Sequence, residues 1–271
     1  MTRHQAFWRD PDLPFIEVRV VHDGREVNHA RHLHETFSVG VITGGRSSYE
    51  NGAHSEVVEA GTVVVMNPGD AHVCNAIDGG GWSYLMFYLD AAWTGRIQAD
   101  LQGGEDRAFR RYDKAALFAP HLCDAGKQLF AALNDVDSDR LQREIGVVDF
   151  IGLLDGELAP GAAPATEGGL KTERAAKYID AHFAQALRLD EICAEAKLSA
   201  SYLIRAFKKR YGVAPHEYQT NRRIQFAKGR LREGLPLVQV ALEAGFADQA
   251  HFQRVFKRLS AVTPGQYQAS R

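Results

Sequence analysis

The sequence has little cysteine and no long apolar stretch, and each shortage excludes a class of protein. The 271 residues include only three cysteines, Cys74, Cys123 and Cys193, and no two of them form a Cys-x-x-Cys pair. Neither a disulfide framework nor a zinc knuckle is indicated, and a reducing compartment fits. No run reaches the roughly 18 apolar residues that a membrane span needs, and the first residues lack the apolar core of a signal peptide. We therefore expect a soluble, cytoplasmic protein.

Net charge is also small, at -2, but it is distributed unevenly along the chain. Residues 171–271 contain 18 Lys and Arg against 9 Asp and Glu, whereas the remaining residues contain 14 against 25. A long basic segment joined to an acidic one suggests a module that binds a polyanion, attached to a module with another partner. An ordinary solvated basic surface is the alternative, and charge alone does not decide between them.

The first part of the chain is rich in short β-branched runs separated by turn signals such as Gly44-Gly45 and Asn51-Gly52. Strands are predicted over residues 16–21, 37–42, 63–66 and 82–89, a pattern typical of an antiparallel sandwich or small barrel. Amphipathic helices are predicted over 115–133 and 140–158, the second with Leu141, Ile145 and Val148 on one stripe. These helices either pair with a second subunit or pack on their own barrel.

A stretch of small residues, proline and glycine over 159–170 predicts a linker between two domains. Every later segment is predicted to be helical: 172–186, 189–196, 200–211, 215–233, 238–244, 249–259 and a turn near Gln266. The expected fold is α+β with two domains. Residues 1–158 are expected to form an antiparallel β-barrel with appended helices, and residues 171–271 an all-α domain; the resemblance described below implies effector binding and dimerisation for the first of these.

The helical half contains a weak internal repeat. Leu203, Arg205, Phe207, Lys208, Pro215, Tyr218 and Gln219 recur 49 residues later as Phe252, Arg254, Phe256, Lys257, Pro264, Tyr267 and Gln268. Residues 192–198 match 240–246 at a spacing of 48, so the second turn is one residue longer. Each copy is predicted to contain a short helix, a tight turn, a capping residue (Ser199 or Asp248) and a second helix. This is the order of elements in a helix-turn-helix motif.

The outward faces of the two second helices are the predicted DNA-reading surfaces. In a major groove, arginine can bond guanine in bidentate fashion, glutamine can bond adenine, and an aliphatic side chain can contact the thymine methyl. The predicted base-contacting residues are Ser201, Ile204, Arg205, Gln249, Ala250, Gln253 and Arg254. The predicted phosphate-contacting residues, which position without specifying, are Lys208, Lys209, Arg222, Arg223, Lys257 and Arg258. The helix over 215–233 would hold the two reading helices in successive major grooves, roughly 34 Å apart. Ordinary exposed charge is the alternative for any single arginine, and an unrelated helical bundle is the alternative for the pair of motifs.

These motifs carry a family resemblance. The segment from about 174 to 268 resembles the double helix-turn-helix domain of AraC-family transcriptional activators, through SASYLIRAFKK (199–209), AGFADQAHFQRVFK (244–257) and TPGQY (263–267). The first part resembles the cupin-like effector-binding domain of that family, through HLHE (32–35), GTVVVMNPGDAH (61–72) and GWSYLMFY (81–88). The resemblance implies a homodimer that binds promoter half-sites, contacts RNA polymerase and holds a small-molecule effector in the barrel.

By position, the resemblance implies an effector pocket among inward-facing strand residues. The candidates are His34, Met66, His72, Trp82, Tyr84 and Met86. An arm made of roughly the first dozen residues, including Phe7 and Trp8, would close over the ligand. Residues 32–42 and 67–72 resemble a subgroup often found beside amino-acid exporters, which implies an amino acid or related metabolite. Ordinary barrel core is the alternative role for Trp82 and Tyr84.

His32, His34 and His72 also resemble the metal-binding histidines of metal-dependent cupins. His32 and His34 share one face of a strand, and imidazoles on adjacent strands can converge on iron, manganese or zinc. Metal-binding cupins normally add a glutamate a few residues later, where this sequence has Ser38 and Val39. We therefore expect no metal, no cofactor and no enzymatic activity. A metal-dependent cupin enzyme with an accessory helical domain is the alternative, and an architectural DNA binder that ignores metabolites is a third.

Overall fold

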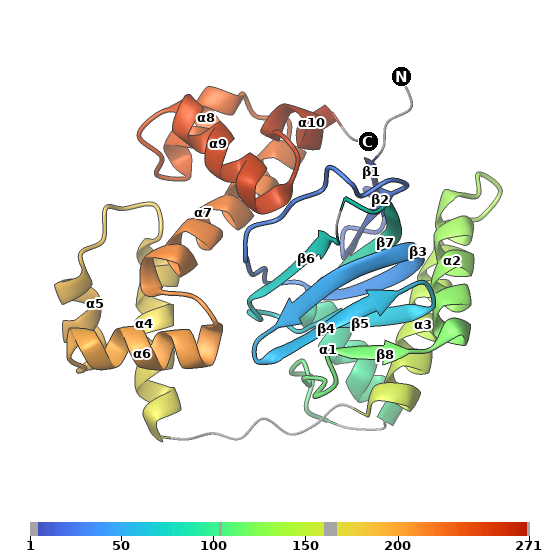
Figure 1. The fold of residues 1–271 in the computed structure, drawn as a ribbon, viewed down its shortest axis with the longest axis horizontal. Helices are drawn as coiled ribbons and strands as arrows, with labels where there is room; N and C mark the ends of the chain where they lie inside the picture. Colours follow the sequence, from blue (N-terminus) through green and yellow to red (C-terminus); the bar gives the residue numbers. More distant parts are fainter. Residues whose placement is uncertain (1–4, 78, 103–104, 160–166, 270–271) are drawn as a thin grey trace.

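The computed structural model describes residues 5–77, 79–102, 105–159 and 167–269. Its first unit is a set of antiparallel strands with helices on one side, and its second unit is entirely helical (Figure 1). The strands are β1 (Gln5–Arg9), β2 (Ile16–Val21), β3 (Phe37–Asn51), β4 (His54–Glu59), β5 (Thr62–Met66), β6 (His72–Ala76), β7 (Trp82–Leu89) and β8 (Ala116–Phe118). The helices of this unit are α1 (Ala91–Gln102), α2 (Pro120–Asn134) and α3 (Arg140–Leu158). The predicted two-domain α+β fold class is confirmed.

One long strand, β3, joins two sheets. Its first half pairs with β5 and β7, and its second half pairs with β4 and β6. The pairing register with β7 shifts between Ile42 and Gly44, which marks a bulge that bends the strand. Gly45 follows with a φ of 69°, and a Cβ there would lie 2.8 Å from Trp82 Cα and closer still to the Gly81 carbonyl. Only glycine fits this turn, which lets β3 cross from one sheet to the other.

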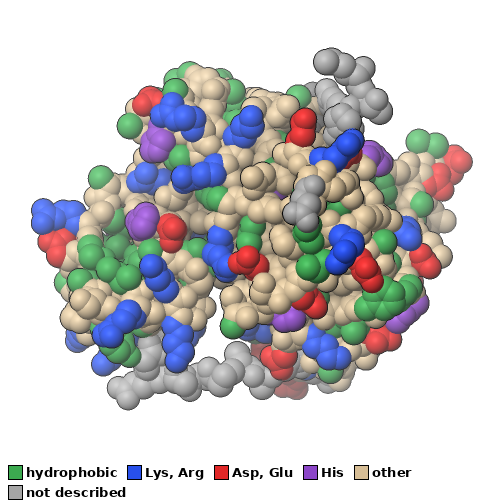
Figure 2. All heavy atoms as spheres, viewed as in Figure 1, with side chains coloured by type: hydrophobic (Ala, Val, Ile, Leu, Met, Phe, Trp, Pro, Cys, Tyr) green, Lys and Arg blue, Asp and Glu red, His purple; other side chains and the backbone are tan. Residues whose placement is uncertain are grey.

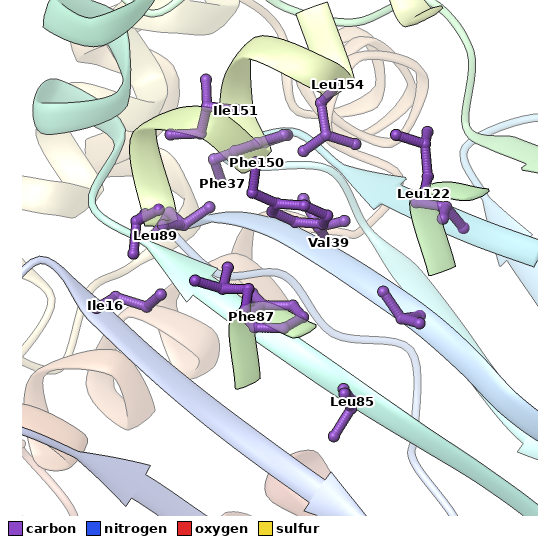
Figure 3. Close-up of a cluster of buried hydrophobic side chains, with 14 of the residues drawn as sticks. Ile16, Phe37, Val39, Leu85, Phe87, Leu89, Leu122, Phe150, Ile151 and Leu154 are labelled. Carbon is purple, nitrogen blue, oxygen red and sulfur yellow. The ribbon is translucent and has the colours of Figure 1, made fainter. Parts of the chain in front are cut away.

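Side-chain alternation along β7 supplies two separate cores. Leu85, Phe87 and Leu89 face α2 and α3, where the Phe87 ring lies 5.4 Å from that of Phe150 (Figure 3). The intervening residues Trp82, Tyr84 and Met86 belong to a different buried cluster on the opposite face of the sheet. Because successive side chains of a strand point to opposite faces, one apolar strand fills both sides. The second cluster encloses the cavity described below.

The helical unit consists of two similar halves connected by a long helix, α7 (Pro215–Arg232), which runs between them in Figure 1. The first half contains α4 (Glu167–His182), α5 (Leu189–Ala196) and α6 (Ala200–Tyr211); the second contains α8 (Leu237–Glu243), α9 (Gln249–Ser260) and α10 (Pro264–Ala269). The Ser199 side chain accepts from the Tyr202 amide, and the Asp248 side chain accepts from the His251 amide. Both predicted helix caps are therefore confirmed. Within the described ranges, no helix has the length and apolar character needed to cross a bilayer.

Some expectations about local structure need correction, including the strand predicted over 37–42, which extends to Asn51. The helix predicted over 115–133 begins only at Pro120, because residues 116–118 form β8 and pair with β5. Helix α1 and strands β1, β4 and β6 were not predicted. Part of the predicted linker, 160–166, lies outside the described residues, and α4 begins at Glu167 rather than at residue 172. The domain boundaries themselves stay predictions.

Candidate nucleic-acid interface and barrel cavity

Helix α6 presents a polar face to solvent and an apolar face to its own core. Leu203 and Phe207 are fully buried, whereas Ser201 and Arg205 are exposed and Ile204 is half-buried. The Arg205 Nε donates to the Ser201 carbonyl at 3.3 Å, one turn back, so the guanidinium lies along the helix surface. Lys208 and Lys209 are exposed in the last turn. The predicted residues of this helix thus lie on an accessible surface.

Helix α9 repeats this arrangement. Its buried face consists of Phe252, Val255, Phe256 and Leu259. Its predicted contact residues Ala250, Gln253, Arg254, Lys257 and Arg258 are exposed, and Gln249 is half-buried. Figure 2 shows Lys and Arg side chains over the helical unit, whereas many of the acidic side chains gather over the strands and their helices. The charge asymmetry of the sequence is therefore also a spatial asymmetry.

Two predicted phosphate contacts on α7 are engaged inside the protein instead. Arg222 forms ion pairs with Glu35 and, through its Nε at 2.8 Å, with Asp180. The Arg223 Nε donates to the Phe183 carbonyl at 2.8 Å. Burial lowers the pKa of both guanidinium groups, in keeping with their partial enclosure. In this arrangement neither side chain is available to a phosphate, so we drop both from the proposed interface.

The six predicted pocket residues, from β5, β6, β7 and the segment before β3, all line one cavity. The lining also includes His29, His32, Tyr49, Val64, Cys74 and Tyr88. Tyr88 could have been predicted, because it continues the alternation of Trp82, Tyr84 and Met86. Tyr49 could not, because the second half of β3 was not predicted as a strand. About 20 Å³ is free for water-sized spheres, which is room for about one water molecule.

Polar tips in the cavity wall are largely satisfied by backbone groups. The Trp82 Nε1 donates to the Gly24 carbonyl at 3.0 Å, and the Trp82 ring stacks on Tyr84 with centroids 4.4 Å apart. The Tyr49 hydroxyl donates to the Val65 carbonyl at 2.9 Å. Burial raises the pKa of Tyr84 and Tyr49 well above the ordinary value, so both hydroxyls stay protonated. The aromatic part of the wall is therefore neutral and held in place.

Three histidines meet at one end of the cavity. One ligand atom from each of His32, His34 and His72 lies within 4.8 Å of the others, and all three side chains are buried. Burial lowers the pKa of all three imidazoles; that of His72 falls to about 4, although hydrogen bonding to Asp70 opposes the shift. The rings are therefore neutral near pH 7. The structure thus brings together the three histidines that the sequence offered as an alternative metal site.

Comparison with known proteins agrees with this two-part architecture. Residues 16–148 match the family described as the AraC-like ligand binding domain, and residues 192–270 match a helix-turn-helix domain family. This chain belongs to the AraC family of transcriptional regulators. It is similar to the HTH-type transcriptional regulator YbfI of Bacillus subtilis, with 24% identity over 81% of this chain and 80% of that protein. It is also similar to RafR, the raffinose operon regulatory protein of Pediococcus pentosaceus, with 24% identity over 88% of this chain and 86% of that protein.

Solved structures show the same fold over nearly all of the chain. An apo structure of ToxT from Vibrio cholerae superposes with a TM-score of 0.64 and 16% identity, covering 94% of this chain and 97% of that one. ToxT bound to an unsaturated fatty acid superposes with a TM-score of 0.59 and 14% identity, covering 98% and 94%. The probable regulator LumQ of Photobacterium leiognathi is 35% identical, but over only 34% of this chain and 37% of its own length. The fold is therefore shared over nearly the full length of the chain, although the sequence identity to these structures is low.

Two cations lie beside the cavity of this AraC-family regulator. Arg19 on β2 is only 2% exposed, and its guanidinium donates to Gln5 Oε1 at 2.6 Å and lies 3.4 Å from His29 Nε2. Lys228 on α7 has its Nζ 6.0 Å from the centroid of the Tyr88 ring. Burial lowers the pKa of Lys228 to about 8, with Glu17 opposing the shift. The DNA-binding half therefore contributes a cation next to the effector half.

Contacts between the two halves continue along α7 and α9. The Asn221 side chain accepts from the Leu33 amide at 3.2 Å, and the Gln225 amide donates to the Leu33 carbonyl at 3.3 Å. The Ala30 amide donates to the Arg258 carbonyl at the end of α9. These bonds surround the segment that carries His32 and His34. The segment is thus held between the sheet and the DNA-binding half.

The N-terminal arm differs from its expected place. Residues 5–9 form β1, which pairs with β2 instead of lying over the cavity. Phe7 packs in the core of the helical unit, with its ring 5.0 Å from that of Tyr267. The Tyr267 hydroxyl donates to Glu17 at 2.9 Å, and Arg9 donates to the Tyr267 carbonyl at 3.0 Å. In this arrangement, β1 joins the two halves and does not cover the cavity.

Proposed function

We propose that this chain is a cytoplasmic, homodimeric activator of transcription that reads promoter DNA with α6 and α9 and responds to a small-molecule effector in the barrel. The observation that carries the proposal is the pair of exposed second helices, each with an arginine on its outward face. Arg205 and Arg254 are the proposed guanine readers, with Gln249 and Gln253 reading adenine. Ser201, Ile204 and Ala250 would contact neighbouring base edges, and Lys208, Lys209, Lys257 and Arg258 would contact phosphates.

The test is a footprint upstream of neighbouring genes, followed by binding measurements on the protected sequence. Arg205→Ala and Arg254→Ala should each weaken binding by about 1 to 3 kcal/mol, or about 5-fold to 150-fold in Kd. Both changes should also relax base preference at one position. Arg107→Ala is the matched control, because it removes an exposed arginine from the effector half. Equal weakening by Arg205→Ala on cognate and random DNA would contradict the base-reading role.

The effector proposed here carries an anionic group, as an amino acid does. Arg19 is buried, and within the described residues no carboxylate forms an ion pair with it. Lys228 adds a second cation at the same end of the cavity. Glu17 partly offsets the charge of Lys228, whereas the buried charge of Arg19 has no carboxylate partner among the described residues, so an anion placed beside Arg19 would be stabilised. The ToxT structure mentioned above was solved with a fatty acid, which also carries a carboxylate.

Effector binding would require this arrangement to open, because the free space fits about one water molecule. The proposed mechanism is a population shift: the effector binds better to a state in which α7 has moved from the barrel. Because α7 also separates α6 from α9, that movement would change how the reading helices meet DNA. Trp82→Ala should abolish the effector response while leaving DNA affinity nearly unchanged. An unaltered response of this variant would remove Trp82 from the site.

Dimerisation is proposed through α3. Leu141 and Ile145, which the sequence places on one stripe, are 64% and 50% exposed, and Val148 is half-buried beside them. An apolar stripe of this kind is better buried against a second copy than left in water. Contact with RNA polymerase and the role of activator rest on family membership. The proposal gives the chain no catalytic role, and turnover of a substrate by the purified protein would favour the enzyme alternative.

A further inference from the structure

Contrary to the expectation from the sequence, we propose that His32, His34 and His72 bind one divalent transition-metal ion, with Zn²⁺ as the reference ion, in the wall of the barrel cavity. The ion would occupy the proposed effector cavity, so its regulatory consequence rests on the proposed function, whereas its binding does not. Imidazole nitrogen is a preferred ligand of zinc, copper, iron and nickel. A three-histidine site leaves at least one coordination position open.

The three rings are already oriented for coordination by the backbone around them. The Nδ1 atoms of His32 and His72 lie 2.9 Å from the carbonyls of Ala30 and Asp70, and the His34 Nδ1 lies 3.2 Å from the Thr36 carbonyl. A carbonyl can only accept, so the Nδ1 atoms of His32 and His72 carry the proton and their Nε2 atoms keep the lone pair. The His34 Nδ1 also lies 3.2 Å from the Thr36 hydroxyl and 3.3 Å from the Ser38 hydroxyl, so coordination through its Nε2 requires the tautomer in which Nδ1 donates to the Thr36 carbonyl. Metal-binding histidines show this arrangement, with the second ring nitrogen donating to a backbone carbonyl or carboxylate.

The three rings lie close together in a rigid setting. Backbone bonds in both directions link His32 and His72, with N–O distances of 3.1 and 2.9 Å. Their ring centroids are 4.5 Å apart, and the His34 ring lies 4.7 Å from that of His72. Nitrogens bound to one tetrahedral Zn²⁺ at about 2.0 to 2.1 Å lie about 3.4 Å apart. The observed separations, up to 4.8 Å, need closure by about 1 Å, which small side-chain rotations supply.

One of these nitrogens is left without a partner. The His34 Nε2 is buried and accepts no hydrogen bond from the described residues. A buried polar atom without a partner is unfavourable by about 1 to 3 kcal/mol and calls for a bound water or ion. The cavity it faces has about 20 Å³ free, which is enough for one water or one metal ion. The space therefore fits an ion better than it fits an intact metabolite.

The neighbouring cations limit what else can bind. Arg19 and Lys228 would repel a dication held by three neutral imidazoles. Among the described residues no carboxylate joins the three histidines, and Ser38 and Val39 stand where metal-binding cupins have a glutamate. An anionic ligand in the open position, either hydroxide or the carboxylate of the effector, would offset that repulsion. Lys228→Met should therefore tighten metal binding by several-fold.

The experiment uses the untagged full-length chain, stripped with a chelator and titrated with Co²⁺ and then with Zn²⁺ in competition with a chromophoric chelator. We expect one ion per chain and the visible absorption of Co²⁺ bound to nitrogen ligands. In the proton NMR spectrum of the Co²⁺ form, three exchangeable, hyperfine-shifted Nδ1–H signals are expected. This readout needs no variant, so it stays decisive if a histidine variant fails to fold. Absence of stoichiometric binding, or of these three signals, would overturn the proposal.

Variants provide a second line of evidence. His34→Asn and His72→Ala should weaken Zn²⁺ binding by at least about 100-fold, since even outer-shell changes weaken metal affinity by 10-fold to 100-fold. The control is His54→Ala, which removes a half-exposed histidine paired with Glu56. Circular dichroism of the stripped variants shows whether they are folded. Equal affinity of folded His34→Asn and the unaltered chain would refute the assignment.

DNA binding by the stripped and the loaded chain separates the two proposals. A stripped chain that selects a promoter sequence but takes up no stoichiometric metal would refute the metal site and leave the regulator intact. A chain that binds one ion but prefers no DNA sequence in either form would support the site and refute the regulator. A change in DNA affinity on loading would support both.

Discussion

The turn between α8 and α9 provides a sharp test of how the two helix-turn-helix units are built. Gly245 has a φ of 79°, and a Cβ at this position would lie 2.7 Å from the carbonyl carbon of Ala184 and closer still to its oxygen. Ala184 follows α4, so the turn of the second unit packs directly on the backbone of the first. Gly245→Ala should therefore disturb both units.

The magnitude of this change has two parts. A left-handed conformation is unfavourable for alanine by about 1 to 2 kcal/mol relative to glycine. The contact with the Ala184 backbone adds strain that no rotamer change relieves, because neither atom belongs to a flexible side chain. We expect a total loss of about 3 kcal/mol, at the upper end for single substitutions. Gly234→Ala isolates the first part, because its φ is 83° and a Cβ there meets no atom within 4 Å.

The internal repeat supplies a third comparison. Lys197 occupies the position equivalent to Gly245 in the first unit and also adopts a left-handed conformation, with a φ of 53°. Its side chain is exposed, so a Cβ is accommodated there. Lys197→Gly should therefore change stability by no more than about 1 kcal/mol, since relief of the backbone strain offsets the flexibility gained by the unfolded chain.

Two optical probes can assign the effect to one half of the protein. All three tryptophans, Trp8, Trp82 and Trp93, belong to the first unit, so tryptophan fluorescence reports on the barrel. Far-ultraviolet circular dichroism is dominated by helices and follows the second unit as well. In urea titrations followed by circular dichroism, Gly245→Ala should lower the free energy of unfolding by about 2 kcal/mol more than Gly234→Ala does. Equal shifts for the two variants would show that the close approach to Ala184 contributes nothing.

Three further outcomes follow from other contacts. Burial lowers the pKa of Lys228 from 10.5 to about 8 in the folded chain. Between pH 8 and pH 10.5 the unfolded state therefore binds more protons than the folded state, so the free energy of unfolding should rise with pH over this range. Lys228→Met should abolish this rise, worth up to about 3 kcal/mol, in urea unfolding measured from pH 7 to 10. Tyr267→Phe removes the hydroxyl that donates to buried Glu17 and should lower the free energy of unfolding by about 1 to 2 kcal/mol; no change would mean that Arg9 and Arg232 satisfy the carboxylate without it. Ile145→Glu should shift sedimentation from dimer to monomer, and an unaltered profile would place the dimer interface elsewhere.

Local sequence patterns predicted the elements whose boundaries are set by local chemistry. The predicted ranges of α5 and α6 match the structure at both ends, because Ser199 caps α6 and Gly212 ends it in a left-handed conformation. The strand over 82–89 was also predicted in full, since a short run rich in aromatic residues that begins directly after the turn signal Gly79-Gly80-Gly81 favours a strand. These signals act within a few residues, so they can be detected in one sequence.

Elements formed by distant partners could not be predicted in this way. Residues 116–118 continue an amphipathic pattern, yet they extend as β8 because the exposed edge of β5 offers backbone partners. The role of Arg222 depends on Glu35, 187 positions earlier, and on Asp180. From the sequence alone, Arg222 is an arginine on a basic helix and is predicted to contact phosphate. Only the structure shows its two carboxylate partners. The six residues that the family resemblance implied for the pocket do line one cavity, and their role in effector binding stays a prediction. The cations beside them come from long-range packing.

Helix α7 is the element through which the cavity and the reading helices can influence each other. It has 18 residues, so it is about 27 Å long. Along this length it binds Glu35 through Arg222, the Leu33 backbone through Asn221 and Gln225, and the cavity end through Lys228. A ligand can shift the docked arrangement only by its difference in affinity between docked and released states, and a nearly complete switch needs about 10⁴-fold. One neutralised lysine supplies a small part of that difference, so an effector must also alter the histidine-bearing segment that Asn221 and Gln225 hold. In the proposed mechanism, the coupling would therefore depend on residues 30–34 as well as on Lys228.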